Sequence, residues 1–342
     1  MGSRITELME TTALNLESLR DKVLVVDTFN QIYMFLTTIR QRDGSLLMDS
    51  HNNITSHLSG LFNRFTKLME NDIKFVFVFD GKAPELKNKE REHRKEIKID
   101  AKKKYEEAKK EKDMERMKKY ASRTSIITND IIKSSKELIT ALGFPVVQAP
   151  SEGEAQAAYM VKKGDAYAVL SQDADSLMFG APKIIKNLTI TKKRKQSNKL
   201  VYETIQPELI SLDKNLNKMG IDQDQLIFMG ILMGTDYNRG GIKGIGPKKA
   251  LKLIKDKGKD FDGIFNEIKD NWDFDFGWEK IFGLIKNMGV VVDYNIEFKG
   301  IDEEAVVDLM VKKHDFSEER IRKRLKDLQK NKPKEESLNK FF

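Results

Sequence analysis

The feature of this sequence that most limits its fold is a set of short, nearly uncharged runs that end in an aspartate. Three runs rich in β-branched and aromatic residues have this form, at residues 23–27, 75–80 and 167–173. A fourth run, residues 144–148, has a similar composition without the terminal acid. Apolar runs of this length are typical of strands that are buried on both faces of a parallel sheet.

Helical patterns separate these runs. Apolar residues recur at helical spacing over residues 31–40, 55–69, 130–142 and 152–163. Gly143 and Gly164 follow the last two segments, at the position where a glycine commonly ends a helix. Strands that alternate with helices predict a doubly wound α/β fold, with a mostly parallel central sheet and helices on both faces.

Residues 82–119 interrupt the alternation. They hold 16 Lys or Arg and 10 Asp or Glu, a net charge of +6, with few apolar positions. Such a segment cannot build a core of its own, so we expect helices that project from the domain or a partly disordered arm. A helical half is expected at residues 222–328, followed by a polar tail at residues 331–342.

Composition narrows the chemistry. The chain has no cysteine, which excludes disulfides, thiolate zinc sites and a cysteine nucleophile. Its four histidines are scattered, which disfavours a multi-histidine metal site. The formal charge of +8 suggests an anionic partner. No apolar run is long enough to span a membrane and no signal peptide is apparent, so we expect an intracellular protein without membrane association.

Acidic residues fall at positions that the predicted sheet would bring together. The carboxyl ends of parallel strands line one crevice, and ligands bind there. Six acids end the apolar runs, follow them closely or open the helix after residue 148, and a seventh follows an apolar helical segment. They are Asp27, Asp80, Asp173, Asp175, Glu152, Glu154 and Asp236.

So many carboxylates cannot all stay ionised in one cleft without a countercharge, because like charges raise each other's pKa. Bound divalent cations supply that charge, and oxygen ligands suit Mg²⁺ or Mn²⁺ rather than zinc. Two such ions about 4 Å apart activate a water and stabilise both oxygens of an in-line phosphoryl displacement. The acids therefore predict metal-dependent phosphodiester hydrolysis.

Other interpretations of the acids remain open at this point. Strand-terminal aspartates often cap helices or form turns. Residues 151–154 fit a capping box, which would explain Glu154 without catalysis. Asp173 and Asp175 also resemble the nucleophile motif of aspartyl-phosphate phosphatases, although that motif follows the first strand of the sheet, where Asp27 stands alone here.

A glycine-rich segment at residues 241–250 runs into a helical pattern. Gly244 and Gly246 let a phosphate approach the backbone closely, and Lys248 and Lys249 add positive charge. This is the helix-hairpin-helix type of signature, which grips a DNA backbone without reading its sequence. An ordinary Gly-Pro turn between helices is the alternative.

Three further side chains are candidates for DNA contact. Lys87 and Arg94 lie seven residues apart, so a helix over both would place them on one face. Cations beside a metal–carboxylate site can stabilise a phosphate in its transition state, although a solvated helix is the alternative. Tyr33 could stack on a base, and its alternative is a core position.

Together these motifs resemble the flap endonucleases of the structure-specific 5′ nuclease family, especially the archaeal members. The resemblance covers nearly the whole chain. Its motifs are Met1-Gly2, Val26-Asp27, Thr55-Ser-His-Leu58, Val78-Phe-Asp-Gly81, Ala149-Pro-Ser-Glu-Gly-Glu-Ala155, Ser171-Gln-Asp-Ala-Asp-Ser176, Gly234-Thr-Asp-Tyr237, Gly244-Ile-Gly-Pro-Lys-Lys249 and Phe316-Ser-Glu-Glu-Arg-Ile321.

The resemblance implies a single nuclease domain at residues 1–328 that cuts 5′ flaps at a junction with duplex DNA, in replication and repair, with a 5′–3′ exonuclease activity. It implies two Mg²⁺ ions on the seven acids, with Mn²⁺ as a substitute. Lys87 and Arg94 would contact the scissile phosphate at the base of a helical arch (residues 82–122), and Tyr33 would stack on the terminal base pair. Gly2, Arg40 and Thr55 would also contact DNA.

The resemblance adds K⁺ at the helix-hairpin-helix type region (residues 222–260) and a flexible tail (residues 329–342) that binds a sliding clamp of the PCNA type. Leu338, Phe341 and Phe342 fit the family's clamp-binding peptide, but Glu335 takes the place of its glutamine. A merely apolar C-terminus is the alternative. A monomer in an archaeal cytoplasm is expected.

Two other functions stay open on sequence. A sibling nuclease, a resection exonuclease or a Holliday-junction resolvase, would share the acids and the hairpin, but typically carries a long C-terminal extension. A catalytically silent module that binds DNA and the clamp would be expected to lack a metal carboxylate, and all seven acids are present.

Overall fold

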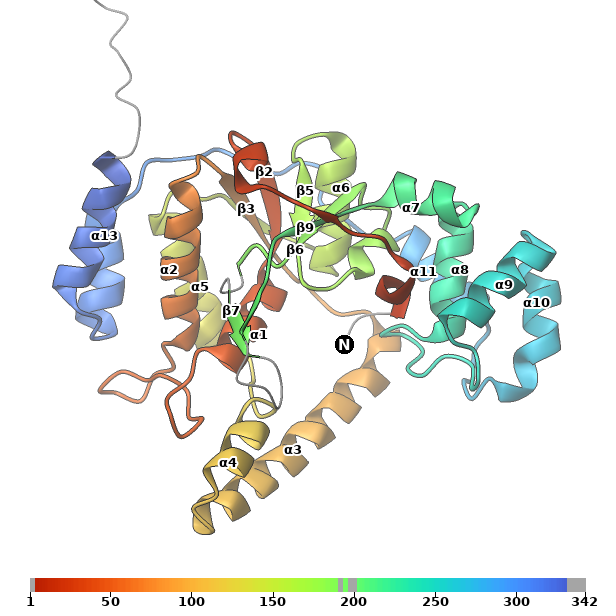
Figure 1. Ribbon diagram of the computed structural model, residues 1–342, viewed down its shortest axis with the longest axis horizontal. Coiled ribbons are helices and arrows are strands. Elements are labelled where there is room, and N and C mark those ends of the chain that lie inside the picture. Colours follow the sequence, from red (N-terminus) through yellow and green to blue (C-terminus); the bar gives the residue numbers. More distant parts are fainter. Residues whose placement is uncertain (1–3, 190–192, 196–201, 331–342) are drawn as a thin grey trace, which may run out of the picture.

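A seven-stranded sheet forms the centre of the molecule (Figure 1) in the computed structural model, which describes residues 4–189, 193–195 and 202–330. The strands from β6 to β4 are parallel, and the pairs β6–β9 and β9–β1 are antiparallel. The expected doubly wound, mostly parallel sheet is thus confirmed. The strand order is β1 (Thr12–Ala13), β9 (Glu208–Ser211), β6 (Lys183–Lys186), β5 (Ala168–Leu170), β2 (Val23–Asp27), β3 (Lys74–Phe79) and β4 (Val146–Gln148).

The central strands are buried on both faces, as their uncharged sequences predict. Along β3, Phe75 and Phe77 pack into the core on one side of the sheet, whereas Val76 and Val78 pack into the core on the other. Phe65 of the neighbouring helix packs edge-on against both phenylalanines, with ring centroids 5.0 and 4.8 Å apart. Alternate side chains of one strand therefore join the two helical layers through the sheet.

Helices cover both faces (Figure 1). The phenylalanine-rich face carries α1 (Thr28–Thr38), α2 (Ser56–Met69), α5 (Asn129–Ala141), α12 (Glu303–Val307), a π-helical segment (Asp308–Lys313) and α13 (Glu318–Lys330). The other face carries α6 (Gly153–Lys163), α7 (Leu212–Met219), α8 (Gln223–Met233), α9 (Pro247–Lys257), α10 (Phe261–Ile268) and α11 (Trp278–Lys286).

Short elements complete the chain. They are the 3₁₀ turns η1 (Arg4–Leu8), η2 (Leu16–Leu19), η3 (Glu85–Lys87), η4 (Asp175–Leu177) and η5 (Lys269–Asn271), and a two-stranded sheet of β7 (Lys193–Lys195) and β8 (Tyr202–Thr204).

The charged segment forms two helices that project from the body of the molecule (Figure 1). They are α3 (Asn88–Lys110) and α4 (Met114–Ala121). The buried residues of the pair are few and mostly small: Glu90, Ala101 and Ala108 on α3, and Met117 and Ala121 on α4. The expectation of projecting helices is confirmed. We call the pair the α3–α4 hairpin.

Most predicted elements agree with the structure to within three residues, and one strand differs in a way that matters. The predicted strand at residues 167–173 is paired only over Ala168–Leu170. Beyond it, the backbone N–H of Asp173 bonds to the Ser171 hydroxyl at 3.1 Å. A side chain and not a neighbouring strand thus satisfies this donor, and Asp173 lies past the strand rather than at its end.

The C-terminal half is mostly helical, as expected, with irregular segments that include residues 234–246 between α8 and α9 and residues 287–302 between α11 and α12. No helix in the described parts of the chain is both long and apolar enough to cross a membrane. Four predicted contact residues, Gly2, Leu338, Phe341 and Phe342, lie outside the described residues, as does Glu335.

Candidate metal centre and nucleic-acid interface

The predicted acids come from five segments of the chain. Asp27 is the last residue of β2, Asp80 follows β3, and Asp175 begins η4. Glu152 and Glu154 lie at the start of α6, and Asp236 follows α8. Carboxylate oxygens of Glu154, Asp173 and Asp175 lie within 4.8 Å of one another, which is close enough to hold one metal ion.

Hydrogen bonds fix the two acids nearest the sheet. Asp27 caps α1 by accepting from the Asn30 N–H at 3.1 Å, and it also accepts from the Ser171 hydroxyl at 3.0 Å. Asp80 accepts from the Gly153 N–H at 2.7 Å. The capping interpretation of these aspartates is therefore correct for Asp27. It does not exclude a metal, because a carboxylate has further lone pairs to offer.

The start of α6 differs from the predicted capping box. The Ser151 hydroxyl donates to the Lys82 carbonyl at 3.1 Å, and Glu152 occupies the N-cap position but its own side chain makes no capping hydrogen bond. A Cβ at Gly153 would lie 2.4 Å from the Asp80 carboxylate, so this glycine permits the close approach of Asp80. The capping-box explanation of Glu154 is wrong, because the adjacent strand end and not Ser151 satisfies the helix start.

Burial and mutual repulsion shape the ionisation of the cluster. Burial, then the charge of Asp80, raises the pKa of Asp27 to about 7. Burial, then Glu152, raises the pKa of Asp80 to about 6. Burial also raises the pKa of Glu154, with Asp175 as the next cause. Such carboxyl groups are typical of a cation-binding site, because the charge of bound cations offsets the repulsion between the carboxylates and keeps them ionised.

The donor set fits divalent metal ions. All seven side chains offer carboxylate oxygen, the ligand type that Mg²⁺ and Mn²⁺ prefer. Glu152 is 5% exposed, and its Oε1 has no hydrogen-bond partner among the described residues. A buried acceptor without a donor costs free energy, and a cation would satisfy it.

Lys87 and Arg94 reach the same cluster, although Lys87 lies in η3, directly before the helix α3 that carries Arg94. Lys87 Nζ lies 2.8 Å from Glu152 and 3.2 Å from Asp236. Arg94 Nη2 donates to Asp236 at 2.7 Å. Burial alone would lower the pKa of Lys87, but Glu152 and Asp236 outweigh it and raise that pKa. Both side chains stay charged beside the acids.

The other predicted DNA contacts differ among themselves. Tyr33 is 41% exposed and faces Lys98 of α3, whose Nζ lies 5.8 Å from the ring centroid, so Tyr33 is not a core residue. Thr55 is buried. Arg40 donates to the Gly44 carbonyl and the Ser125 hydroxyl at 2.7 and 2.6 Å. DNA contact by Thr55 and Arg40 stays a prediction that this arrangement does not favour.

The glycine-rich loop joins α8 to α9. Ile242 and Ile245 are buried and hold the loop to the core, whereas Lys248 and Lys249 are exposed. Gly244 has φ of +81° and open space where a Cβ would be. Left-handed backbone of this kind favours glycine. The loop thus presents bare backbone and lysines at the start of α9.

Sequence reasoning missed three residues that organise the site. Ser171 joins Asp27 to Asp173, and Glu90 binds Arg94 at 2.7 Å. Asn238 is fully buried, accepts from Thr235 and donates to the Ile231 carbonyl, which shapes the loop carrying Asp236. Asparagine two residues after an acid is too common a pattern to predict this, and Glu90 looks like any other acid of a charged helix.

Comparisons with known proteins agree with this geometry. The XPG N-terminal domain matches residues 3–101 and the XPG I-region matches residues 143–236. Flap endonuclease 1 of Staphylothermus marinus is 49% identical over 326 residues, which cover 95% of this chain and 93% of that protein. Flap endonuclease 1 of Thermofilum pendens is 47% identical over 347 residues and covers 100% and 99%.

Solved structures give the same result. Flap endonuclease-1 from Methanococcus jannaschii superposes with a TM-score of 0.75 at 38% identity and covers 96% of this chain and 98% of that one. The catalytic core of Rad2 in complex with DNA substrate has a TM-score of 0.66 at 24% identity over 95% of this chain and 97% of that one, and it shows the shared fold.

The fold and the acidic site thus define a structure-specific nuclease of the XPG class, whose members depend on metal ions. Within that class, the chain belongs to the flap endonuclease family. It is therefore a phosphodiester-hydrolysing enzyme, and DNA replication and repair are the processes in which this family acts.

Proposed function

We propose that this protein cuts 5′ flaps at the junction with duplex DNA, and cleaves 5′ ends as an exonuclease, with two Mg²⁺ ions for which Mn²⁺ can substitute. The observation that carries the proposal is the meeting of acids from five chain segments with two cations at the base of the α3–α4 hairpin, Lys87 of η3 and Arg94 of α3. A site with this composition suits a phosphodiester, because it offers ligands for metal ions and positive charge for the phosphate.

The acids would divide the work of holding the metals. Glu154, Asp173 and Asp175 form the tightest group, so we assign them to one ion, and Glu152 with its unpaired oxygen is a further ligand. Asp27, Asp80 and Asp236 would act directly or through water. When bound, the ions supply an activated water and charge stabilisation for the attacking and leaving oxygens.

Lys87 and Arg94 would orient the scissile phosphate. Both stay charged, and both already contact Asp236, so they lie at the edge of the acidic cluster rather than at the far end of the hairpin. Their charge would offset the growing negative charge of the phosphate in the transition state. Tyr33 is exposed on α1 and suits stacking on the terminal base pair.

The duplex would be held by the loop between α8 and α9. Exposed Lys248 and Lys249 and the backbone of Gly244 and Gly246 suit a phosphate backbone, and K⁺ is the cation we propose there. The arch (82–122), the duplex-binding region (222–260) and the tail (329–342) remain our proposed divisions of the chain. For the tail, we propose a sliding clamp of the PCNA type as the partner, and for the enzyme a monomer in the cytoplasm.

The test is cleavage of a labelled double-flap DNA in Mg²⁺ or EDTA, beside single-stranded and blunt duplex controls. We expect Mg²⁺-dependent incision near the flap junction, with the controls largely spared. Binding without incision in both Mg²⁺ and Mn²⁺ would favour the silent module. Preferred cutting of a four-way junction would favour the resolvase.

A further inference from the structure

Glu90 is a buried acid that the metal site does not require. It lies in the first turn of α3, three residues after Lys87, and its side chain is 10% exposed. Other acids of this helix, such as Glu92 and Glu96, are exposed to solvent. A carboxylate is rarely buried unless charged partners compensate the loss of water, so the partners of Glu90 are informative.

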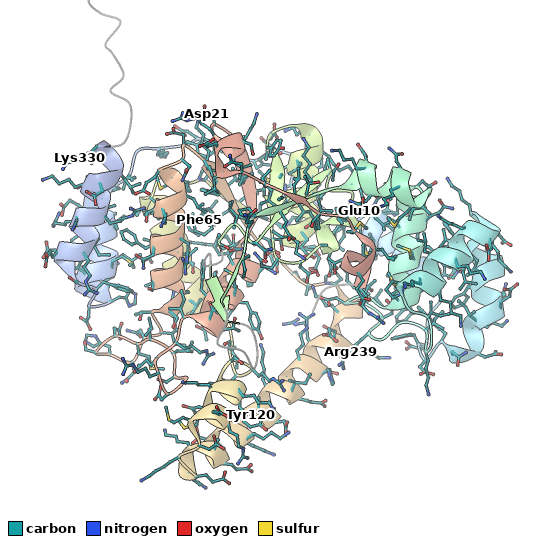
Figure 2. The ribbon with its side chains drawn as sticks, in the orientation of Figure 1. Glu10, Asp21, Phe65, Tyr120, Arg239 and Lys330 are labelled. Atoms are coloured by element: carbon teal, nitrogen blue, oxygen red, sulfur yellow. The ribbon has the colours of Figure 1, made fainter. Side chains whose placement is uncertain are left out.

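Two guanidinium groups from different segments provide this compensation. Arg94 Nε, one turn along α3, donates to Glu90 Oε1 at 2.7 Å. Arg239 Nε, from the loop between α8 and α9, lies 3.3 Å from Glu90 Oε2 and forms an ion pair with it, without hydrogen-bond geometry. Figure 2 shows Arg239 beside the base of α3. The carboxylate of Glu90 therefore links the first turn of α3 to the loop between α8 and α9, which carries Asp236.

The contacts of Arg94 use two corners of its guanidinium. Nε is bound to Glu90, and Nη2 is bound to Asp236 at 2.7 Å. Nη1 has no acceptor among the described residues, and the Arg94 side chain is 39% exposed. A free arginine side chain samples many rotamers, and two bonds at fixed corners of its planar group restrict both its position and its tilt.

We propose that Glu90 is a positioning residue for cleavage: it holds Arg94 so that the remaining N–H groups of the guanidinium face the scissile phosphate. This inference rests on the proposed function, in which Arg94 contacts that phosphate. Through Arg239, Glu90 also keeps α3 in register with the Asp236 loop. The reacting phosphate therefore meets Arg94 and the metal ligands in one fixed arrangement, and small misplacements at this point slow catalysis strongly.

The test is a double-mutant cycle with Glu90→Gln and Arg94→Ala. Single-turnover cleavage of a double-flap DNA measures the chemical step, and binding of the same DNA in EDTA measures affinity. We expect Glu90→Gln to slow cleavage about tenfold with affinity within about twofold, because Gln keeps the size but loses the charge that orients Arg94. Glu92→Gln, the same change on an exposed residue of α3, should leave the rate unchanged.

The cycle separates positioning from a general structural role. If Glu90 acts through Arg94, adding Glu90→Gln to Arg94→Ala should slow cleavage by less than about twofold further. An equal loss in both backgrounds, or a wild-type rate for Glu90→Gln, would overturn the proposal. If Glu90→Gln fails to fold, as judged by its thermal unfolding midpoint, Glu90→Asp replaces it. Asp keeps the charge but shortens the reach by one methylene, and should give a smaller loss that also disappears in Arg94→Ala.

Failure of this inference is distinguishable from failure of the proposed function. If the wild-type protein cuts flap DNA and Arg94→Ala is slow, a normal rate for Glu90→Gln overturns only the role of Glu90. If the wild-type protein does not cut flap DNA in Mg²⁺ or Mn²⁺, the proposed function is wrong and this inference falls with it.

Discussion

The acidic cluster and the loop between α8 and α9 both suit a phosphate backbone, but they are built in opposite ways. In the cluster, buried charges from distant segments compensate one another, as Lys87 does for Glu152 and Asp236. In the loop, apolar Ile242 and Ile245 provide the anchor, while Lys248 and Lys249 extend freely into solvent. We infer that cleavage requires a buried site in which charged side chains compensate one another, whereas binding of the DNA backbone requires only separate exposed charges.

The largest expected effect comes from breaking the coupled site. Asp175→Ala removes a carboxylate of the tightest group, so we expect single-turnover cleavage to fall about a thousandfold or more, equivalent to about 4 kcal/mol of transition-state stabilisation. DNA affinity in EDTA should change little, because the grip lies elsewhere. The control is Asp262→Ala, an acid in the first turn of α10. Normal cleavage by Asp175→Ala would remove this residue from the metal site.

Removing a cation of the cluster should have the next largest effect. Lys87→Ala leaves Glu152 and Asp236 without their shared partner, and we expect cleavage to slow about a hundredfold while affinity falls by less than about threefold. The exposed Lys89, two residues away, is the matched control. An affinity loss as large as the rate loss would demote Lys87 to general electrostatic attraction.

The pH dependence of metal binding tests the burial of the acids. The pKa values of Asp27 and Asp80 are about 7 and about 6, above the ordinary 3.8, so their protonated forms dominate at pH 5.5. Protons and Mg²⁺ compete for these oxygens, so Mg²⁺ affinity should rise by about tenfold or more from pH 5.5 to pH 7.5 and then level off. Calorimetric titration at these pH values measures it.

The shifted pKa values of buried groups also make the stability of the protein depend on pH. Because the folded pKa of Asp27 lies above its unfolded value, its contribution to the free energy of unfolding is complete below about pH 4 and is lost as pH rises through about 7. His57 acts oppositely, since burial lowers its pKa to about 3. The useful measurement is therefore the thermal unfolding midpoint in Mg²⁺ minus the midpoint in EDTA. The contribution of His57 is the same in both and cancels from this difference. This difference should grow with pH, and a constant difference would contradict the burial argument.

The smallest effects are expected at the exposed loop. Lys248→Ala and Lys249→Ala should each weaken duplex binding a few-fold at low salt and lower the slope of log affinity against log salt by about 1, roughly additively. Cleavage at saturating enzyme should be unchanged. Exposed Lys269, in η5, is a control of equal charge. A slope unchanged by either substitution would exclude the loop from the grip.

Much of this protein is determined by local sequence. The uncharged runs that became β2 and β3 fix the parallel sheet, because only a site covered on both faces accepts residues such as Phe75 and Val76 in succession. The positions of Asp27 and Asp80 at strand ends follow directly. The α3–α4 hairpin could also be predicted from the sequence, since helices with so few apolar residues must project into solvent.

Only the tertiary structure decided the details at the cluster. The early end of β5, the absence of a cap at Ser151 and the burial of Glu90 all involve partners far away in sequence: Asn30, which accepts from the Gln172 N–H, Lys82 and Arg239. A charged group or a hydroxyl pairs with whichever polar group the fold brings near it. Pairs between residues that are far apart in the sequence therefore cannot be predicted from the sequence. Periodicity records which face of an element is apolar, but not which polar groups meet across the site.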